Sequence, residues 1–191
     1  MSTKTAVFLA LSLAVSAASA DKGLVLSPTA LGPLPLTGKP AKVSEAKLKS
    51  LFPQYGVKYE IHSGDSPDFH YFEVSTPKGE VLFTIQSFGT WESPPTKTTA
   101  EVPISLLQIR SKEIKDVYGL RIGDRVKDII AKRGKDLKFG AGHFDALMGD
   151  GEIYYSLVPG PAYNAENLTK EDAIEGNWQI RSISWPEGAW E

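Results

Sequence analysis

Three segments between residues 57 and 88 alternate apolar and polar side chains and are separated by turn-forming residues. In the first segment, Val57, Tyr59 and Ile61 alternate with lysine, glutamate and histidine. The second and third segments, residues 69–76 and 80–88, flank a Pro-Lys-Gly turn. A period of two sends successive side chains to opposite faces of a strand, and a short glycine-containing loop joins antiparallel strands. This region therefore predicts half-buried antiparallel sheet.

Two short helices are predicted beside these strands. One spans residues 44–52, where Ser44 is a suitable N-cap and the following proline ends the helix. The other spans residues 124–133, with Asp124 as its expected cap and Ile129 on its apolar side. Just before the second helix, Gly123 is expected to turn the chain.

The order of these predicted elements occurs twice. Each copy begins with a short extended segment and continues with a helix and three strands. The copies comprise residues 34–36, 44–52, 57–62, 69–76 and 80–88, and then residues 120–122, 124–133, 136–139, 152–158 and 177–185. Residues 103–110 form a further predicted strand, and residues 140–151 a glycine-rich loop. The sequence thus predicts an α+β fold with mainly antiparallel sheet, two short helices on one side and a duplicated unit; an unrelated run of hairpins is the alternative.

Residues 1–20 have the pattern of a secretory signal peptide. Lys4 supplies the positive charge, residues 6–15 are apolar, and Ala-Ser-Ala at positions 18–20 is a small-residue cleavage motif. The apolar run is shorter than the roughly 20 residues that span a bilayer, so a membrane anchor is the less favoured interpretation. We expect cleavage near Ala20 and a periplasmic location.

The remaining chain is expected to form an extended N-terminal arm at residues 21–40 and a single α+β domain at residues 41–191. Loss of Lys4 with the leader changes the formal net charge from −2 to −3, which gives no electrostatic reason to expect a nucleic-acid partner. No later apolar stretch is long enough to cross a membrane. The chain contains no cysteine, which excludes disulfides, zinc-thiolate sites and thiol catalysis.

Three histidines are candidate metal ligands. His62 and His70 fall on neighbouring predicted strands, and His143 lies in the glycine-rich loop. Imidazole and carboxylate groups together can hold a transition metal, and the nearby carboxylates are Asp68, Glu73 and Asp145. No metal-binding helical pair of the H-E-x-x-H type occurs, so exposed strand histidines are the favoured interpretation.

A hydrolase site is a second chemical possibility. His143 and Asp145 can be combined with Ser66 or Ser156 into a catalytic triad, but no nucleophile-elbow motif is present. Two pairs of carboxylates, Asp65 with Asp68 and Asp150 with Glu152, lie in turn-forming runs where aspartate usually binds its own backbone. The sequence therefore assigns no catalytic, cofactor-binding or metal-binding residue, and no cofactor is expected.

Aromatic residues gather in the predicted strands, where most are expected to pack in the core. Tyr154 and Tyr155 are adjacent, so one of them should lie outside the core unless both faces of the sheet are covered. An outward-facing ring can anchor a protein partner or a sugar. The strand aromatics are Phe69, Tyr71, Phe72, Tyr154, Tyr155, Trp178 and Trp185, with Trp190 close to the C-terminus.

Several segments together resemble the RpoE-regulated lipoprotein family, a group of Gram-negative envelope proteins whose chemistry is unassigned. The matching segments are PLTGKPAKVSEAKLKSLFPQY (35–55), HYFEV (70–74), GLRIGDRVKDIIAKRG (119–134), GEIYYSL (151–157) and NWQIRSISW (177–185). The resemblance implies residence in the envelope and a link to envelope stress. This chain lacks the lipid-bearing cysteine of the family, so a soluble periplasmic form or a released form is expected in place of outer-membrane anchoring.

Three functional hypotheses follow. The first is a non-catalytic binding protein of the envelope, whose partner is an envelope protein or a peptidoglycan-related molecule. The second is a secreted inhibitor, for example of lysozyme, although Ser63 and Gly64 are too far from Tyr71 to match the Ser-Gly-x-x-Tyr loop of some inhibitors. The third is a hydrolase that uses a metal or a histidine. We favour the first, because no catalytic constellation is evident.

Overall fold

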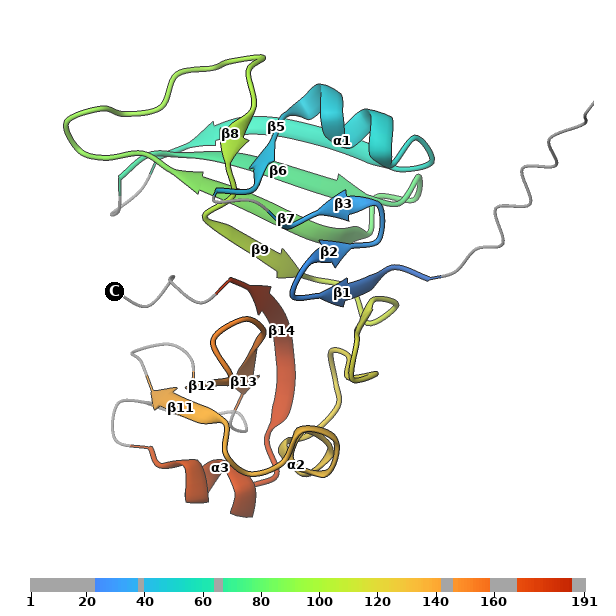
Figure 1. Ribbon diagram of the computed structural model, residues 1–191, viewed down its shortest axis with the longest axis vertical. Helices are drawn as coiled ribbons and strands as arrows, with labels where there is room; N and C mark the ends of the chain where they lie inside the picture. Colours follow the sequence, from blue (N-terminus) through green and yellow to red (C-terminus); the bar gives the residue numbers. More distant parts are fainter. Residues whose placement is uncertain (1–22, 38–39, 64–66, 142–145, 159–167, 187–191) are drawn as a thin grey trace, which may run out of the picture.

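An eight-stranded sheet organises the chain (Figure 1), and every neighbouring pair of its strands is antiparallel. The computed structural model describes residues 23–37, 40–63, 67–141, 146–158 and 168–186. The strand order is β11 (Lys138–Ala141), β12 (Ala146–Gly149), β13 (Tyr154–Val158), β14 (Gln179–Trp185), β9 (Leu106–Ile109), β7 (Val81–Phe88), β6 (Phe69–Ser75) and β5 (Gly56–His62). The predicted α+β class with mainly antiparallel sheet is confirmed.

The sheet consists of two halves that meet at its centre. In the first half, helix α1 (Glu45–Leu51) precedes strands β5, β6, β7 and β9 in the chain. In the second half, helix α2 (Val126–Arg133) precedes β11, β12, β13 and β14. The last strand of each half lies at the centre, where Ile183 of β14 is opposite Ile109 of β9. Each half is therefore a helix followed by four strands, whereas three strands were predicted for each unit.

Three details of the predicted secondary structure were wrong. A third helix, α3 (Lys170–Glu175), precedes β14, and strand β12 lies within the segment predicted as a glycine-rich loop. The strand predicted at residues 120–122 is only an isolated bridge between Arg121 and Lys115. These elements are short, so their formation depends on neighbours in space rather than on a periodic sequence pattern.

The signals at the helix ends were mostly correct. The Ser44 hydroxyl accepts a hydrogen bond from the Lys47 amide at 3.2 Å, which caps α1. Gly123 has the expected positive φ, of 94°. The N-cap of α2 lies one residue later than predicted, because Arg125 occupies that position and Asp124 instead accepts from the Arg121 amide at 3.0 Å.

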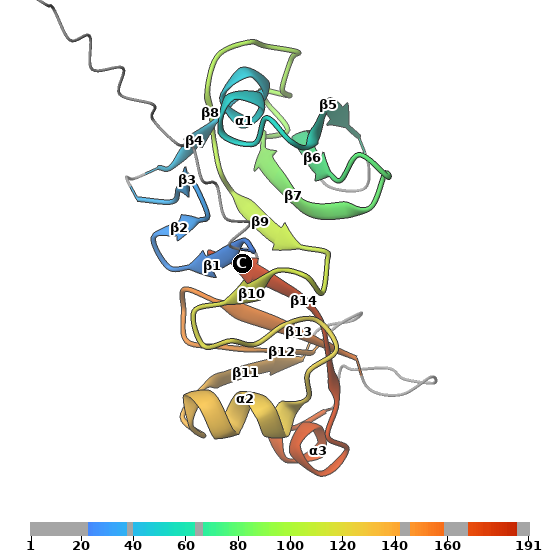
Figure 2. The same ribbon diagram turned by 90° about the vertical axis from the view of Figure 1, so that its right-hand side faces the viewer.

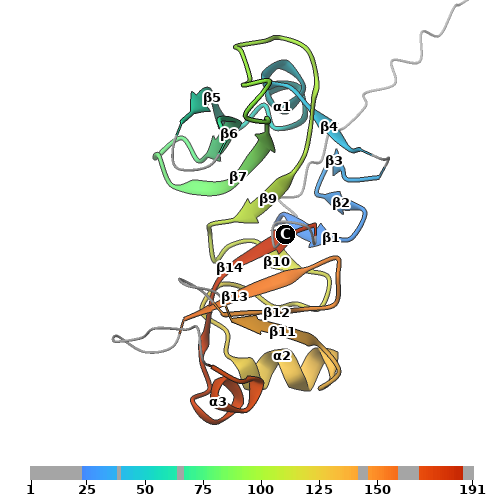
Figure 3. The same ribbon diagram turned by 90° about the vertical axis from the view of Figure 1, so that its left-hand side faces the viewer.

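The two helices cover the apolar face of the sheet, which we call the inner face. Helix α1 and its C-cap contribute Leu48 and Phe52, and the Phe52 ring lies edge-on to Phe83 of β7 with ring centroids 5.3 Å apart. Helix α2 contributes Val126 and Ile129, which are both fully buried. Figures 2 and 3 show α1 on one side of β5, β6 and β7, and no described helix on the opposite side. The first half of the sheet therefore has an open outer face.

Two small sheets complete the structure. Strands β1 (Val25–Ser27), β2 (Ala30–Leu31) and β3 (Leu34–Pro35) form a small sheet with β10 (Lys115–Asp116), and β4 (Lys42–Val43) pairs with β8 (Val102–Pro103). The first three strands lie in the segment expected as an extended arm, and Leu26, Leu31 and Leu34 are fully buried there. The predicted signal peptide lies outside the described residues. Within the described ranges, no helix has the length and apolar character needed to cross a bilayer.

Candidate functional site

His62 and His70 do not converge on a metal site, because their side chains lie on opposite faces of the sheet. In the pairing of β5 with β6, His62 is opposite Phe69 and His70 is opposite Ile61. His70 is buried on the inner face, whereas the His62 side chain is 40% exposed. His143 and Asp145 lie outside the described residues. Among the residues that the structure describes, no three histidine and carboxylate side chains form a metal-binding group.

His70 instead forms a buried hydrogen-bonded pair with Tyr59. The Tyr59 hydroxyl lies 2.9 Å from Nδ1 of His70 and accepts from the Thr98 amide at 3.2 Å. Burial lowers the pKa of His70, and the neutral ring can accept the proton of the Tyr59 hydroxyl. This pair fastens the loop between β7 and β8 to the inner face, so its role is structural.

A serine nucleophile is not assembled in the described part of the chain. Ser66, His143 and Asp145 lie outside it. Ser156 of β13 is opposite Ser182 of β14, and its buried hydroxyl has no hydrogen-bond partner among the described residues. The Ser182 hydroxyl accepts from the Gln108 amide group at 3.0 Å. A triad requires a base that is hydrogen-bonded to the nucleophile, and no such contact to Ser156 is present among these residues.

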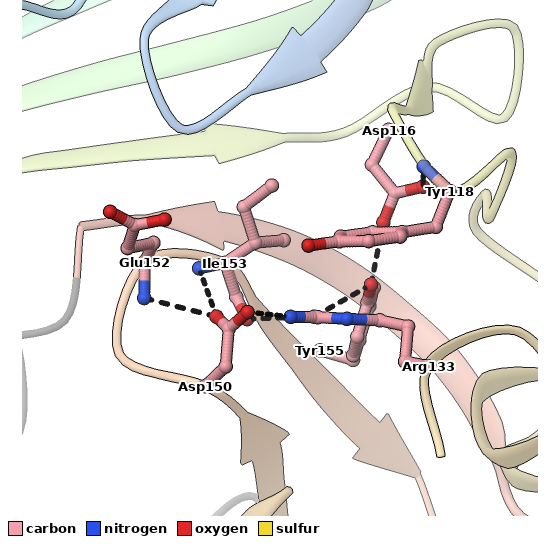
Figure 4. A network of polar contacts seen from close by, with 7 residues as sticks. All are labelled: Asp116, Tyr118, Arg133, Asp150, Glu152, Ile153 and Tyr155. Atoms are coloured by element: carbon pink, nitrogen blue, oxygen red, sulfur yellow. Dashed lines mark hydrogen bonds and ion pairs between the residues drawn. The ribbon is translucent and has the colours of Figure 1, made fainter.

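A buried polar network, which we call the Arg133 network, joins α2 to the sheet (Figure 4). The Tyr155 hydroxyl donates to Asp116 at 2.5 Å and accepts from Nη1 of Arg133 at 2.9 Å. Nη2 of Arg133 forms an ion pair with Asp150. The guanidinium also lies 4.3 Å from the centre of the Tyr118 ring, in cation–π geometry. Three segments of the chain, residues 116–118, the end of α2 and residues 150–155, are thus linked through Arg133 and Tyr155.

The ionisation states of this network are fixed by its surroundings. Burial raises the pKa of Tyr155, and Asp116 adds to that rise. Burial opposes ionisation of Arg133 and Asp150, but their mutual contact and the hydrogen bonds to each overcome it, so the pKa of Arg133 is raised and that of Asp150 lowered. The Tyr155 hydroxyl donates to Asp116 and accepts from Arg133, so both of its hydrogen-bonding roles are used within the network. These contacts link α2 to the sheet and to the segment that carries Asp116.

Asp150 also has a second structural role, which the sequence indicated. Its Oδ1 accepts from the amides of Glu152 and Ile153, at 3.1 and 3.2 Å, as expected of an aspartate in a turn. Its partnership with Arg133 was not apparent, because nothing in a helix-terminal arginine identifies a carboxylate 17 residues away.

Tyr154 and Tyr155 are both buried although they point to opposite faces of β13, so the second of the two alternatives holds and both faces of the sheet are covered here. Tyr155 lies on the inner face, opposite Ile183. Tyr154 lies opposite Gly149 of β12, where a β-carbon would come within 2.5 Å of the tyrosine ring. The absence of a side chain at Gly149 therefore leaves room for the Tyr154 ring to lie against the sheet. Neither tyrosine is available to a partner.

Four rings gather on the open outer face of the first half, and we call them the aromatic cluster: His62, Phe69, Tyr71 and Phe88. His62 stacks on Tyr71 with centroids 4.2 Å apart, and Phe69 meets Phe88 edge-on at 5.7 Å. Phe88 is 44% exposed although its side chain is wholly apolar. The strand patterns identify Phe69 and Tyr71 as strand aromatics but do not single out Phe88 or the His62 ring; the predicted hairpin pairing was the signal that could have added them.

Charged side chains border the aromatic cluster on β5. Glu60 forms an ion pair with Lys58 at 2.9 Å and a hydrogen bond with Nε2 of His62 at 3.3 Å. These contacts lower the pKa of Glu60, with the Lys58 hydrogen bond as the larger cause, so its carboxylate remains charged. Burial raises the pKa of Tyr71, so its hydroxyl remains neutral and can donate a hydrogen bond. The result is an apolar centre with a polar rim, as in many protein-binding surfaces.

A shallow groove of about 550 Å³ lies elsewhere, where the N-terminal strands approach the end of β14. Its lining is almost entirely apolar and includes Leu36, Ile104 and Trp185. The one indole N–H there already donates to the Pro28 carbonyl at 3.0 Å. Without converging polar groups among its described lining residues, the groove has little to orient a ligand. The aromatic cluster is therefore the stronger candidate site.

Fold and surface together define an α+β protein with a helix-backed antiparallel sheet and an open aromatic face. No family model matches the chain, and no curated protein matches it. Among solved structures, the fold is similar to the crystal structure of the uncharacterized protein yfeY from Escherichia coli, with a TM-score of 0.58 and 20% sequence identity. The likeness covers 85% of this chain and 99% of that chain. It establishes a shared fold with a protein from a Gram-negative bacterium.

Proposed function

We propose that this chain is an exported, non-catalytic binding protein of the Gram-negative envelope that docks a protein partner on the aromatic cluster. The observation that carries the proposal is the Phe88 ring, which is 44% exposed at the end of a packed group of rings. Clustered aromatic side chains within a polar rim typify the centres of protein interfaces.

Sequence features support the rest of the proposal. The leader-like residues 1–20 and the absence of cysteine suit a periplasmic protein. The resemblance to the RpoE-regulated lipoprotein family suits an envelope-stress role. We also propose that the two helix-and-four-strand halves arose by duplication, which is supported by their equivalent chain order and by the central pairing of their last strands.

Crosslinking in intact cells of the native host tests the docking proposal. The wild type is compared with the double variant Tyr71→Ala/Phe88→Ala and with a control, Val117→Ala, which alters an exposed apolar residue outside the cluster. Mass spectrometry should identify one dominant protein with the wild type and the control, and at least a tenfold weaker signal with the double variant. Equal capture by all three proteins, or capture of peptidoglycan fragments alone, would contradict the proposal.

The inhibitor hypothesis uses the same open face, because a projecting aromatic cluster is also suited to filling an enzyme cleft. A direct assay separates the two hypotheses. If the partner is a lysozyme, the purified protein slows lysis of peptidoglycan by that enzyme, and the double variant does so at least tenfold less effectively. If lysis is unchanged at saturating protein, the inhibitor hypothesis is excluded and only the envelope-partner hypothesis is left.

A further inference from the structure

Strand β5 is an edge strand with an unusually self-complementary sequence. It is the last strand of the eight-stranded order, so no strand in the described part of the chain pairs with its outer edge. It is seven residues long, Gly56–His62. An exposed edge of this length presents unpaired backbone N–H and C=O groups, which can pair with another strand.

We propose that β5 pairs with β5 of a second copy of this chain, in antiparallel register about Tyr59. This register places Lys58 opposite Glu60 of the other copy, and Glu60 opposite its Lys58. Both side chains lie on the outer face and are 61% and 41% exposed, so they are free to approach a facing strand. Two cross-strand ion pairs form by symmetry, each beside the existing pair between Lys58 and Glu60 within one strand.

The inner side of the strand is self-complementary in the same register. Val57 falls opposite Ile61 of the second copy, and Tyr59 falls opposite its counterpart. Val57 and Ile61 are only half-buried and pack at the margin of the core. The paired copy would cover these margins with matching apolar side chains. Shifting the register by two residues brings Lys58 opposite Lys58 or Glu60 opposite Glu60, so charge selects one alignment.

The dimer has a consequence for the outer face. In an antiparallel pair of identical strands, the twofold axis is perpendicular to the sheet, so equivalent residues point to the same side. The two sheets become continuous, and both aromatic clusters lie on one face. Formation of this dimer does not depend on which partner docks on the aromatic clusters.

Charge-reversal variants test the dimer by sedimentation equilibrium and native mass spectrometry at concentrations up to about 1 mM. The wild type should show a monomer–dimer equilibrium. Lys58→Glu places carboxylates opposite each other across the dimer, and Glu60→Lys places lysines opposite each other. Each variant should weaken self-association about tenfold or more. The control Lys78→Glu makes the same charge change in the exposed β6–β7 turn and should leave the dissociation constant unchanged.

Mixing the two variants gives the decisive result. Lys58→Glu carries two carboxylates on the edge and Glu60→Lys carries two ammonium groups, so the mixture should form a heterodimer in the same register. The Lys58 and Glu60 side chains are 61% and 41% exposed and Lys78 is exposed, and circular dichroism checks that each variant keeps the fold. A wild type that is monomeric throughout, a dimer insensitive to both reversals, or a mixture that forms no heterodimer would overturn the proposal.

Discussion

The two halves of the sheet share a plan but differ in where they place their polar and aromatic groups. The second half buries charge: the Arg133 side chain is 2% exposed, and it connects Asp150 to Tyr155. The first half exposes rings: the aromatic cluster lies on its open face, and Phe88 is 44% exposed. Buried charge is costly unless every partner is in place, whereas exposed apolar surface has little structural use.

This difference distinguishes the two halves of one fold. In the Arg133 network, the guanidinium and the Tyr155 hydroxyl have their partners within the network. The aromatic cluster leaves Phe88 exposed and has a charged strand beside it. The proposed docking surface therefore lies on the first half, and the second half is expected to contribute rigidity. Four predictions test this division, in order of decreasing expected effect on stability.

Ile129→Asp should unfold the second half. Ile129 is fully buried on α2, and an unpartnered carboxylate there is expected to cost more than about 4 kcal/mol of unfolding free energy. Urea denaturation followed by circular dichroism measures the change. The control Lys127→Asp adds a carboxylate to an exposed position of the same helix and should change the free energy by less than about 0.5 kcal/mol. An unchanged midpoint for Ile129→Asp would show that this helix face is not packed.

Arg133→Met should destabilise by about 3 kcal/mol, because the Asp150 carboxylate and the Tyr155 hydroxyl lose a shared donor whose side chain is buried. Lys132→Met is the matched control. Lys132 is the neighbouring cation and donates to the Gly119 carbonyl at 2.8 Å from an exposed position, so its loss should cost less than about 1 kcal/mol. Equal urea midpoints for the two variants would mean that the network contributes little to rigidity.

His70 should make the first half sensitive to acid. Its pKa is lowered by burial, so the unfolded chain binds this proton more readily than the folded chain. The contribution to stability is fully present above the ordinary value of 6.5 and is lost as the pH falls towards the lowered pKa. Unfolding free energies measured at intervals between pH 7 and 5 should fall less steeply for His70→Gln than for wild type. His62→Gln is the control; a slope change as large as that of His70→Gln would count against this assignment.

Phe88→Ser should have the smallest effect, with a loss of less than about 1 kcal/mol, since the ring is already partly in water. Phe83 lies on the same strand but faces inward and is fully buried, so Phe83→Ser should cost more than about 3 kcal/mol. Thermal unfolding of both variants compares the two faces of β7 directly. Similar losses would show that the outer face contributes to the core and is not free for a partner.

The sequence alone determined the local structure of the first half. The alternation of apolar and polar residues predicted the bounds of β5, β6 and β7 to within one residue, because period-two patterning and hairpin turns are local signals. Ser44 and Gly123 were also identified correctly, because capping and positive φ depend on the residue itself and its near neighbours. The antiparallel sheet and the α+β class followed from these elements.

Only the tertiary structure decided which side chains meet. The Arg133 network joins residues from position 116 to position 155, and Tyr154 is buried because Gly149 is opposite it. Likewise, the register between β5 and β6 places His70 and His62 on opposite faces of the sheet, where His70 pairs with Tyr59. Such contacts depend on strand register and on distant partners, which no local pattern encodes. The open face is the same kind of result: a sequence predicts that a strand has two faces, but helix packing decides which one is left exposed.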